Sequence, residues 1–101
     1  MASRLFLQAQ LEQLLGGPNV YFQPPESVKM NYPAIVYALD DLKNAHADDG
    51  VYLSYKRYSV TVIDKNPDSP FVDMVAKMQT CRFNRHYKSD NMNHWNFSIY
   101  F

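Results

Sequence analysis

The strongest constraint on the fold of this chain is the alternation of apolar and polar residues near its end. The apolar positions are Trp95, Phe97, Ile99 and Phe101, and the positions between them are His94, Asn96, Ser98 and Tyr100. A period of two places successive side chains on opposite faces of a strand, so one face of this strand is expected in a core. Because the chain ends on an apolar position, we expect an ordered strand there rather than a tail.

The residues before this strand complete a hairpin. Cys81, Phe83 and Tyr87 alternate with Arg82, Asn84, His86 and Lys88, and the turn signal Ser-Asp-Asn follows at 89–91. We expect two antiparallel strands joined at this turn. Regular alternation places Cys81 and His86, five residues apart, on opposite faces, and it lets His86 and His94 lie opposite each other on one face.

Three further segments have strand character. Residues 19–23 (NVYFQ) form a short strand closed by two prolines, and residues 34–39 (AIVYAL) are apolar on both faces, as in a central strand. Residues 51–63 are β-like throughout, with Tyr58, Val60 and Val62 on one face. This run is long for one strand, so we expect a bulge or bend near Lys56-Arg57.

Two helices are expected. The first covers 3–15, with Ser3 as its cap, a leucine stripe on one side, and Gly16-Gly17 at its end. The second begins at Ser69-Pro70, a good N-cap followed by a residue suited to the first helical position, and ends near 79–80. The order α-β-β-β-α-β-β predicts a single α+β domain over 1–101: two layers, with two helices packed on a largely antiparallel sheet of about five strands.

Charge is balanced, with ten basic and ten acidic side chains, so no net field gathers nucleic acid and a free-standing DNA binder is disfavoured. The acidic, turn-rich stretch 40–50 holds Asp40, Asp41, Asp48 and Asp49, whereas basic residues gather at Lys56, Arg57, Arg82, Arg85 and Lys88. Such patches are complementary and can join neighbouring copies. A solvated mixed surface is the alternative interpretation. Eight Tyr and six Phe likewise fit either an interface or a β-rich core.

The sequence offers little for catalysis or cofactors. Cys81 is the only cysteine, so no disulfide forms within the chain, and no activating motif surrounds it. His86 and His94, with Asp90 or His46, lack a metal-ligand spacing, and no phosphate-binding loop is present. The basic set near Tyr87 and Trp95 is a weak nucleic-acid signal, because core alternation explains both rings. We expect no enzyme activity, no metal and no cofactor.

The expected location is a reducing cytoplasm. The first residues, MASRLFLQAQLEQ, lack the apolar run of a signal peptide, and the longest apolar run, 33–39, is far too short to span a membrane. The residues alone therefore indicate a soluble interaction or assembly protein.

Four stretches in a fixed order carry a family resemblance. They are MNYPAIVY (30–37), HADDGVYL (46–53), KRYSVTVIDKNPDSP (56–70) and CRFNRHYKSDNMNHWNFSIYF (81–101). Together they resemble the small tail-terminator, or tail-completion, proteins of long-tailed bacteriophages with non-contractile tails. The resemblance implies a small α/β fold in a hexameric ring at the head-proximal end of the tail tube.

The resemblance also implies partners and a location. The ring ends tube polymerisation and provides a surface for head-tail joining. Its partners are other copies of the chain, the tail tube protein and a head-closure or neck protein. Genomic DNA passes through the lumen without sequence-specific binding, and no membrane is involved. The protein belongs to the tail-neck region of the virion and is assembled in the host bacterial cytoplasm.

Under this hypothesis the charged loop 64–69 is a stiff edge presented to a partner, because Pro67 and Pro70 lower the entropy lost on docking. Its candidate contacts are Asp64, Lys65, Asn66 and Asp68. The segments 24–33 and 40–50 are further candidates. The acidic cluster facing a neighbour's Arg57, Arg82 or Arg85 predicts a head-to-tail interface that closes into a ring. The remaining interface candidates are His86, Lys88, Asp90, Asn91 and His94. The alternatives are a head-closure or adaptor protein of the neck, and a small nucleic-acid-binding module.

Overall fold

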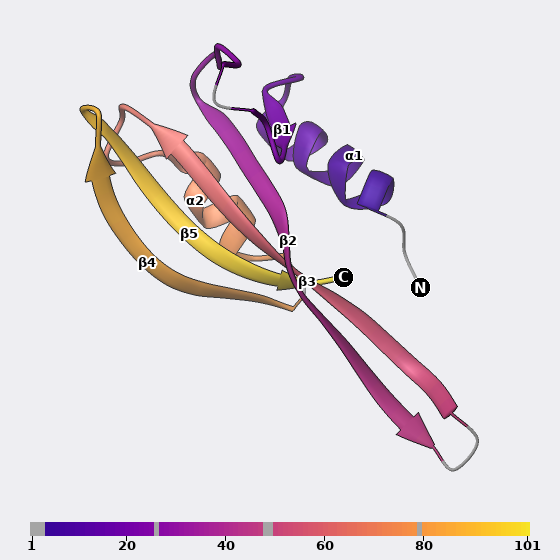
Figure 1. The fold of residues 1–101 in the computed structure, drawn as a ribbon. Coiled ribbons are helices and arrows are strands. Elements are labelled where there is room, and N and C mark those ends of the chain that lie inside the picture. The colour runs from indigo at the N-terminus through magenta and orange to yellow at the C-terminus, as the bar shows by residue number, and fades with distance from the viewer. Residues whose placement is uncertain (1–3, 26, 48–49, 79) are drawn as a thin grey trace.

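A computed structural model describes the backbone of residues 4–25, 27–47, 50–78 and 80–101, and the side chains of these residues outside 42–55. The elements in chain order are α1 (Arg4–Leu15), β1 (Val20–Phe22), β2 (Ala34–Ala47), β3 (Gly50–Asp64), α2 (Pro70–Ala76), β4 (Cys81–Ser89) and β5 (Met92–Tyr100). This is the expected α+β architecture and element order (Figure 1).

The five strands form one sheet in the order β1-β2-β3-β5-β4. β1 runs parallel to β2, and the other three pairings are antiparallel. The β4 strand is therefore one edge of the sheet, and it is nine residues long, whereas β1 at the other edge has three. This difference makes β4 the longer of the two edges.

The core lies between the helices and one face of the sheet. Leu7 and Leu11 of α1 and Val75 of α2 belong to the same buried cluster as the central strands. The strands contribute alternate residues to it: Ile35 and Tyr37 from β2, Tyr58, Val60 and Val62 from β3, and Trp95, Phe97 and Ile99 from β5. The period-two predictions for β3 and β5 are confirmed, because burial of one face stabilises that register. We call this side of the sheet the covered face and the other side the open face.

The β2–β3 hairpin is longer than the sequence pattern indicated. The predicted acidic loop over 40–50 is wrong for residues 40–47, which continue β2; Asp48 and Asp49 lie outside the described residues. Beyond Asp41 and Arg57 the two strands pair only with each other among the described residues, and this part extends past the other strands (Figure 1). Backbone pairing overrides the weak strand propensity of Asp and Asn here.

The irregularity expected near Lys56-Arg57 lies on the opposite strand. Leu39 pairs with Tyr58 and Asp41 with Arg57, so Asp40 is the extra residue of a bulge in β2. A second register shift falls between Ala45 and His46. Bulges increase the local twist of a pair of strands, and both β2 and β3 continue through the two register shifts.

A bulge also changes the last hairpin. β4 and β5 meet at the predicted turn, where Asp90 and Asn91 both have positive φ, at 53° and 62°, as a two-residue hairpin loop requires. However, the register shifts between Phe83 and Arg85, so strict alternation fails in β4. His86 pairs with Trp95 and Tyr87 with His94. The prediction that His86 and His94 share a face is therefore wrong, and so is the separation of Cys81 and His86.

The described helix boundaries agree with the sequence predictions except at the end of α2. Gly16, with φ of 77°, ends α1 as predicted, but Ser3 lies outside the described residues. Ser69 occupies the N-cap position of α2, yet its side chain makes no cap hydrogen bond, and its buried Oγ has no partner among the described residues. α2 ends at Ala76, earlier than the expected 79–80, and the Lys77 amide bonds to the Asp73 carbonyl.

Candidate functional site

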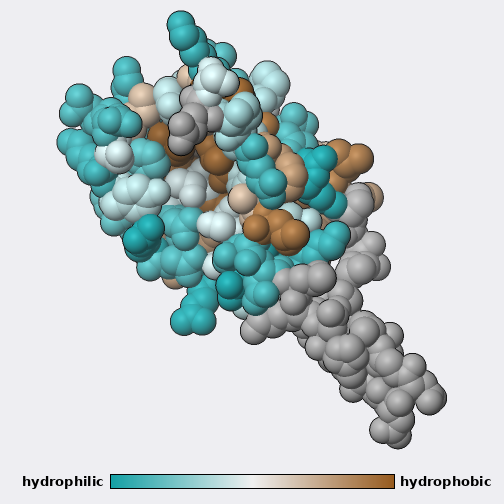
Figure 2. All heavy atoms as spheres, in the orientation of Figure 1, coloured by the Kyte–Doolittle hydropathy of each residue, from teal (hydrophilic) through white to brown (hydrophobic). Residues whose placement is uncertain are grey.

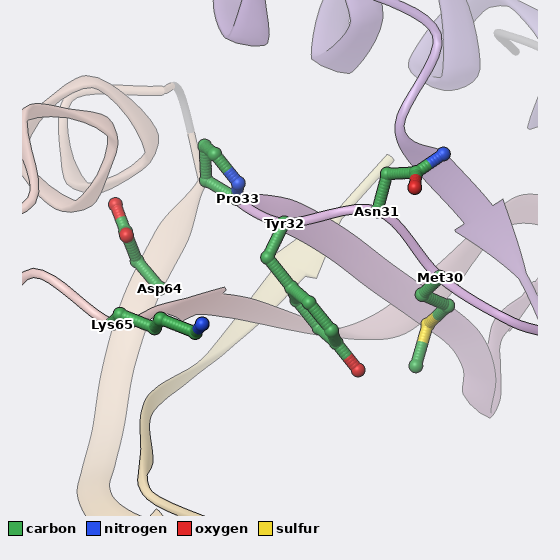
Figure 3. Close-up of a pocket in the computed structure, with 6 residues that line it drawn as sticks. All are labelled: Met30, Asn31, Tyr32, Pro33, Asp64 and Lys65. Atoms are coloured by element: carbon green, nitrogen blue, oxygen red, sulfur yellow. The ribbon is translucent and has the colours of Figure 1, made fainter.

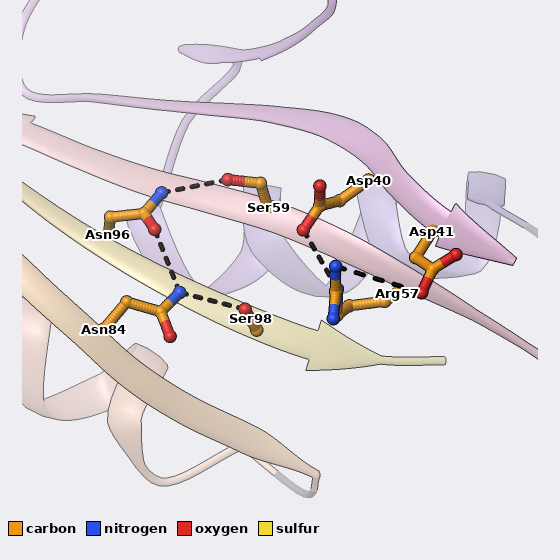
Figure 4. Close-up of polar contacts among 7 residues, drawn as sticks. All are labelled: Asp40, Asp41, Arg57, Ser59, Asn84, Asn96 and Ser98. Carbon is orange, nitrogen blue, oxygen red and sulfur yellow. Dashed lines mark hydrogen bonds and ion pairs between the residues drawn. The ribbon is translucent and has the colours of Figure 1, made fainter. Parts of the chain in front are cut away.

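The open face of the sheet carries a continuous set of polar side chains. Asn96 on β5 donates from Nδ2 to Ser59 Oγ at 2.9 Å and to Thr61 Oγ1 at 3.0 Å. Asn84 on β4 donates from Nδ2 to Asn96 Oδ1 at 3.0 Å and to Ser98 Oγ at 2.9 Å (Figure 4). These bonds join three strands in one ladder. We call the five residues the amide ladder.

The bulge in β4 positions this ladder. Asn84 and Arg85 both lie across from Asn96, with Arg82 across from Ser98. In a regular strand Arg82 and Arg85, three residues apart, would face opposite sides. The additional residue instead brings both arginines to the open face, beside the Asn84 amide, and a bulge of this kind re-aims side chains at a sheet edge. No alternation pattern in the sequence could have shown this.

Arg85 lies over a neighbouring aromatic ring. Its guanidinium carbon lies 4.9 Å from the centroid of the Tyr87 ring, and Tyr87 stacks on His94 with centroids 4.9 Å apart and planes inclined by 15°. The Tyr87 ring therefore contacts both a cation and an imidazole. Arg82 and Arg85 form no ion pair among the described residues, and both side chains are exposed.

Arg57, in contrast, is paired within its own chain. Its Nε lies 2.9 Å from Asp40 Oδ2, and its Nη2 lies 3.9 Å from Asp41 Oδ2 (Figure 4). A hydrogen bond to Tyr100 and the carboxylates of Asp40 and Asp41 raise the pKa of Arg57, although burial opposes them. The two carboxylates predicted to reach a neighbouring copy therefore contact Arg57 of the same copy, where the β2 bulge at Asp40 brings them close.

His86 faces the covered side of the sheet at its rim. Its ring lies 5.2 Å from the Trp95 ring, and Nε2 is 3.0 Å from Asn93 Oδ1. Asn93 is buried and also donates to the Lys65 carbonyl at 3.3 Å, which links the β4–β5 hairpin to the loop after β3. The contacts of His86 are therefore with residues that hold the hairpin against the loop after β3. His94, on the opposite face, instead approaches the Met92 carbonyl at 3.2 Å.

The loop 64–69 is held by its own side chains. Asp64 Oδ1 accepts from the Asn66 amide at 3.1 Å, and Asn66 Oδ1 accepts from the Asp68 amide at 3.0 Å. Two successive turns of this type restrict the loop in addition to Pro67 and Pro70. A hollow of about 280 Å³ lies between this loop and residues 30–33, which precede β2 (Figure 3). It is lined by Met30, Asn31, Tyr32, Pro33, Asp64 and Lys65.

Apolar residues are also exposed, but they are scattered. Leu5 and Phe6 on α1 and Phe83 on β4 are each more than half exposed. In the view of Figure 2, hydrophobic residues lie among hydrophilic ones. Scattered apolar residues are normal on a protein surface and identify no docking site.

Chemical groups suited to catalysis or metal binding are not brought together in the described part of the chain. Burial raises the pKa of the Cys81 thiol, which keeps it protonated, whereas a nucleophilic thiol needs a lowered pKa. No group of three potential metal ligands occurs among the described residues. Within the same residues, no helix has the length and apolar character needed to cross a membrane.

The predicted interface residues thus fall into separate places. Asp40, Asp41 and Arg57 form one cluster; Arg82, Arg85 and His94 share the open face; Lys88 and His86 lie at the covered side of β4. Asp90 and Asn91 form the hairpin turn, and Asp64, Lys65, Asn66 and Asp68 form the loop after β3. Sequence reasoning missed the amide ladder and the role of Tyr87, because hydroxyl and amide residues on a strand look like an ordinary solvated face.

Comparisons with protein-family models and with curated proteins find no match for this chain.

Proposed function

We propose that this protein is a structural subunit of a phage tail-terminator ring, with six copies capping the head-proximal end of the tail tube. The ring ends tube polymerisation and provides the surface for head-tail joining. The four stretches that resemble such proteins support this proposal, and they span most of the chain. The polar open face and the long sheet edge are also compatible with a protein that acts by binding other proteins.

The observation that carries an assembly role is the projecting part of the β2–β3 hairpin. β5 pairs with β3 only from Arg57 to Asp64, and β1 pairs with β2 only from Ile35 to Tyr37. The rest of the hairpin therefore has no third strand among the described residues. An isolated two-stranded ribbon is at best marginally stable in water, so we expect this arm to be stabilised by a neighbouring subunit or the tube.

The internal pairing of Arg57 changes which contacts join neighbouring copies. Because Asp40 and Asp41 lie against Arg57 of the same chain, they are weaker candidates for an inter-subunit ion pair than the sequence indicated. The loop 64–69 and the projecting arm are better placed, because both are presented away from the core. A head-to-tail contact between such unlike surfaces closes into a ring when the rotation permits.

The decisive test is electron microscopy of a phage lysate in which the gene carries an early stop codon, with the intact gene supplied in trans as the control. We expect tails of uncontrolled length beside unjoined, DNA-filled heads. Finished heads without tails would indicate a tube or initiator component. Normal virions would contradict a terminator role.

A second experiment tests the arm directly. Residues 44–54 are replaced by Asn-Gly, which joins the paired residues Lys43 and Tyr55 through a two-residue hairpin loop. The shortened protein is expected to keep its core and its circular dichroism spectrum but to fail to complement the stop mutant. Full complementation by the shortened protein would show that the arm is not needed for assembly.

The alternatives differ in what they bind. A head-closure or adaptor protein binds the portal side rather than the tube protein, so pull-down with purified tube protein separates it from a terminator. A nucleic-acid-binding module has DNA affinity that falls steeply with salt concentration. The zero net charge and the existing contacts of the Tyr87 ring with Arg85 and His94 make that alternative the weaker one.

A further inference from the structure

The β4 edge of the sheet has an unusual combination of length, exposure and charge. Every residue from Arg82 to Ser89 is exposed, and no strand pairs with the outer side of β4 in the part of the chain that the structure describes. Such an edge presents a row of unpaired amide and carbonyl groups that can accept another strand. The edge therefore offers backbone recognition over most of nine residues.

The register identifies which amides point outward. The Tyr100 amide donates to the Thr80 carbonyl at 3.3 Å, and Thr80 continues the register in which Cys81 faces Ile99. In an antiparallel pair, hydrogen-bonded and non-hydrogen-bonded positions alternate. After the bulge, the two-residue turn sets the phase again, with Ser89 opposite Met92. By this alternation the amides that face away from β5 belong to Phe83, His86 and Lys88.

The side chains along this edge are basic on both faces. Arg82 and Arg85 lie on the open face, where the bulge and the Tyr87 ring position Arg85, and Lys88 lies on the other face. No carboxylate pairs with the two arginines among the described residues. A strand that docks here with acidic side chains would place carboxylates against free guanidinium groups, which are suited to two-point hydrogen bonding.

A second copy of the chain fits this edge poorly. If two β4 edges paired around a two-fold axis, the basic residues of one copy would meet the basic residues of the other. Like charges along an edge are a common means of preventing edge-to-edge association. The strand carboxylates whose side chains are described, Asp40, Asp41 and Asp64, are engaged within the chain or at its loop.

Nucleic acid also fits less well than a protein strand. A sugar-phosphate backbone does not form a ladder with outward amides, and base stacking needs a free ring face. The Tyr87 ring already packs with the Arg85 guanidinium and with the His94 ring. The row of outward amides beside the two arginines favours a polypeptide that is both extended and acidic.

We infer that the β4 edge is a docking site for an extended acidic segment of a different protein, which adds to the sheet as a sixth strand. Backbone hydrogen bonds to Phe83, His86 and Lys88 provide the affinity, and carboxylates on Arg82 and Arg85 provide the specificity. This inference goes beyond the proposed ring function and does not depend on it, because it uses only the edge and its charges.

The test measures hydrogen exchange and chemical shifts of backbone amides by NMR. The probe is a synthetic peptide of alternating Thr and Glu, as long as β4. We expect it to slow exchange about tenfold at the amides of Phe83, His86 and Lys88, which form new hydrogen bonds. Three comparison probes are the same peptide with Lys for Glu, an acidic peptide interrupted by prolines, and single-stranded oligothymidylate.

Matched variants separate backbone from charge. His86→Pro removes one outward amide, whereas His86→Ala changes the same side chain and keeps the amide, so only His86→Pro is expected to weaken binding strongly. Arg82→Glu combined with Arg85→Glu is expected to abolish binding. Lys29→Glu combined with Lys77→Glu makes the same change in net charge at exposed positions off the edge and is expected to retain most binding.

Each other result overturns the inference. Equal binding of the proline-interrupted peptide or the oligonucleotide, without slowed exchange at the edge, would show a general anion patch. Slowed exchange that depends on protein concentration alone would show that a second copy occupies the edge. Absence of binding by the acidic peptide would show an edge that only repels other strands.

Discussion

The two faces of β3 and β5 are built from alternate residues of the same strands, yet different interactions stabilise them. On the covered face, Val60 and Phe97 are fully buried and belong to the same hydrophobic cluster as buried residues of both helices. On the open face, the half-buried Thr61 and Asn96 satisfy each other through hydrogen bonds. The first face stabilises the fold by excluding water, which is non-directional, and the second depends on directional bonds at fixed distances.

This difference indicates where substitutions should have a large effect on stability and where they should have a small one. Truncation of a buried apolar side chain lowers the free energy of unfolding in proportion to the size of the group removed, and the cavity left behind lowers it further. A half-exposed hydrogen bond is exchanged for one with water, so its net contribution is small. The covered face should therefore control stability, and the open face should control what the protein binds.

The largest expected effect is that of Phe97→Ala. Phe97 is fully buried and packs against the Phe83 ring at 5.4 Å between centroids. Its truncation should lower the free energy of unfolding by about 3–5 kcal/mol, because a large apolar side chain and its contacts are lost. Urea unfolding measures this change. Ser98→Ala, the next residue on the open face, is the matched control, and an equal loss for both variants would contradict the comparison.

A smaller effect is expected for Asn96→Ala, the centre of the amide ladder. This change removes the bonds to Ser59 and Thr61 and leaves Asn84 without its Asn96 acceptor. Water can replace part of these contacts, so the free energy of unfolding should fall by about 1–3 kcal/mol. The double variant with Asn84→Ala should add little, since the two residues share one network. A loss as large as that of Phe97→Ala would mean that the ladder, rather than the core, dominates stability.

Tyr37 is a polar group on the covered face, and its contribution to stability depends on pH. Its hydroxyl donates to Gln8 Oε1 and accepts from Arg4 at 3.0 Å, while burial raises its pKa above 10.0. The native phenol therefore keeps its proton at a pH where the unfolded phenol has lost it. Its contribution is fully present below the unfolded pKa and is lost as pH rises through the native pKa.

The measurement for Tyr37 is urea unfolding of wild-type protein and Tyr37→Phe from about pH 8 to about pH 11. We expect the wild-type protein to lose more stability than the variant over the alkaline part of this range. Parallel pH profiles for the two proteins would indicate that the Tyr37 phenol titrates alike in the folded and unfolded states.

The smallest expected effect is that of Asp40→Asn. Asp40 and Arg57 are partly exposed, and solvent and salt screen exposed ion pairs, which contribute little to stability. We expect Asp40→Asn to lower the melting temperature less than any of the other variants does. We also expect this change to vanish in high salt. A large change that persists in high salt would show that the β2 bulge depends on this pair.

Much of the fold could be predicted because its signals are local. The period of two in Tyr58, Val60 and Val62, the turn residues Asp90-Asn91 and the Gly16 helix end each follow from a few neighbouring residues. The strand continuation over 40–47 could not, because two aspartates and an asparagine are poor strand formers and only pairing with β3 makes them extend.

The candidate site was harder to predict than the fold. Arg82 and Arg85 were recognised as basic, but their common face depends on an extra residue in β4 that strict alternation excludes. His86 lies on the other face from His94 for a separate reason: the two-residue turn pairs Ser89 with Met92 and so places His86 opposite Trp95. Asn84, Ser98 and Asn96 carry no distinctive pattern in sequence, because their function as a ladder depends on partners that are distant along the chain.

The order of the elements and the buried face of β3 and β5 follow from the sequence alone, since hydrophobic periodicity acts residue by residue. The positions of the register shifts, the contact of Arg57 with Asp40 of its own chain, and the common face of the two arginines depend on tertiary contacts. The physical reason is that a bulge is stabilised by the fit between two strands, so it reverses the faces of all later side chains without leaving a mark in the local sequence.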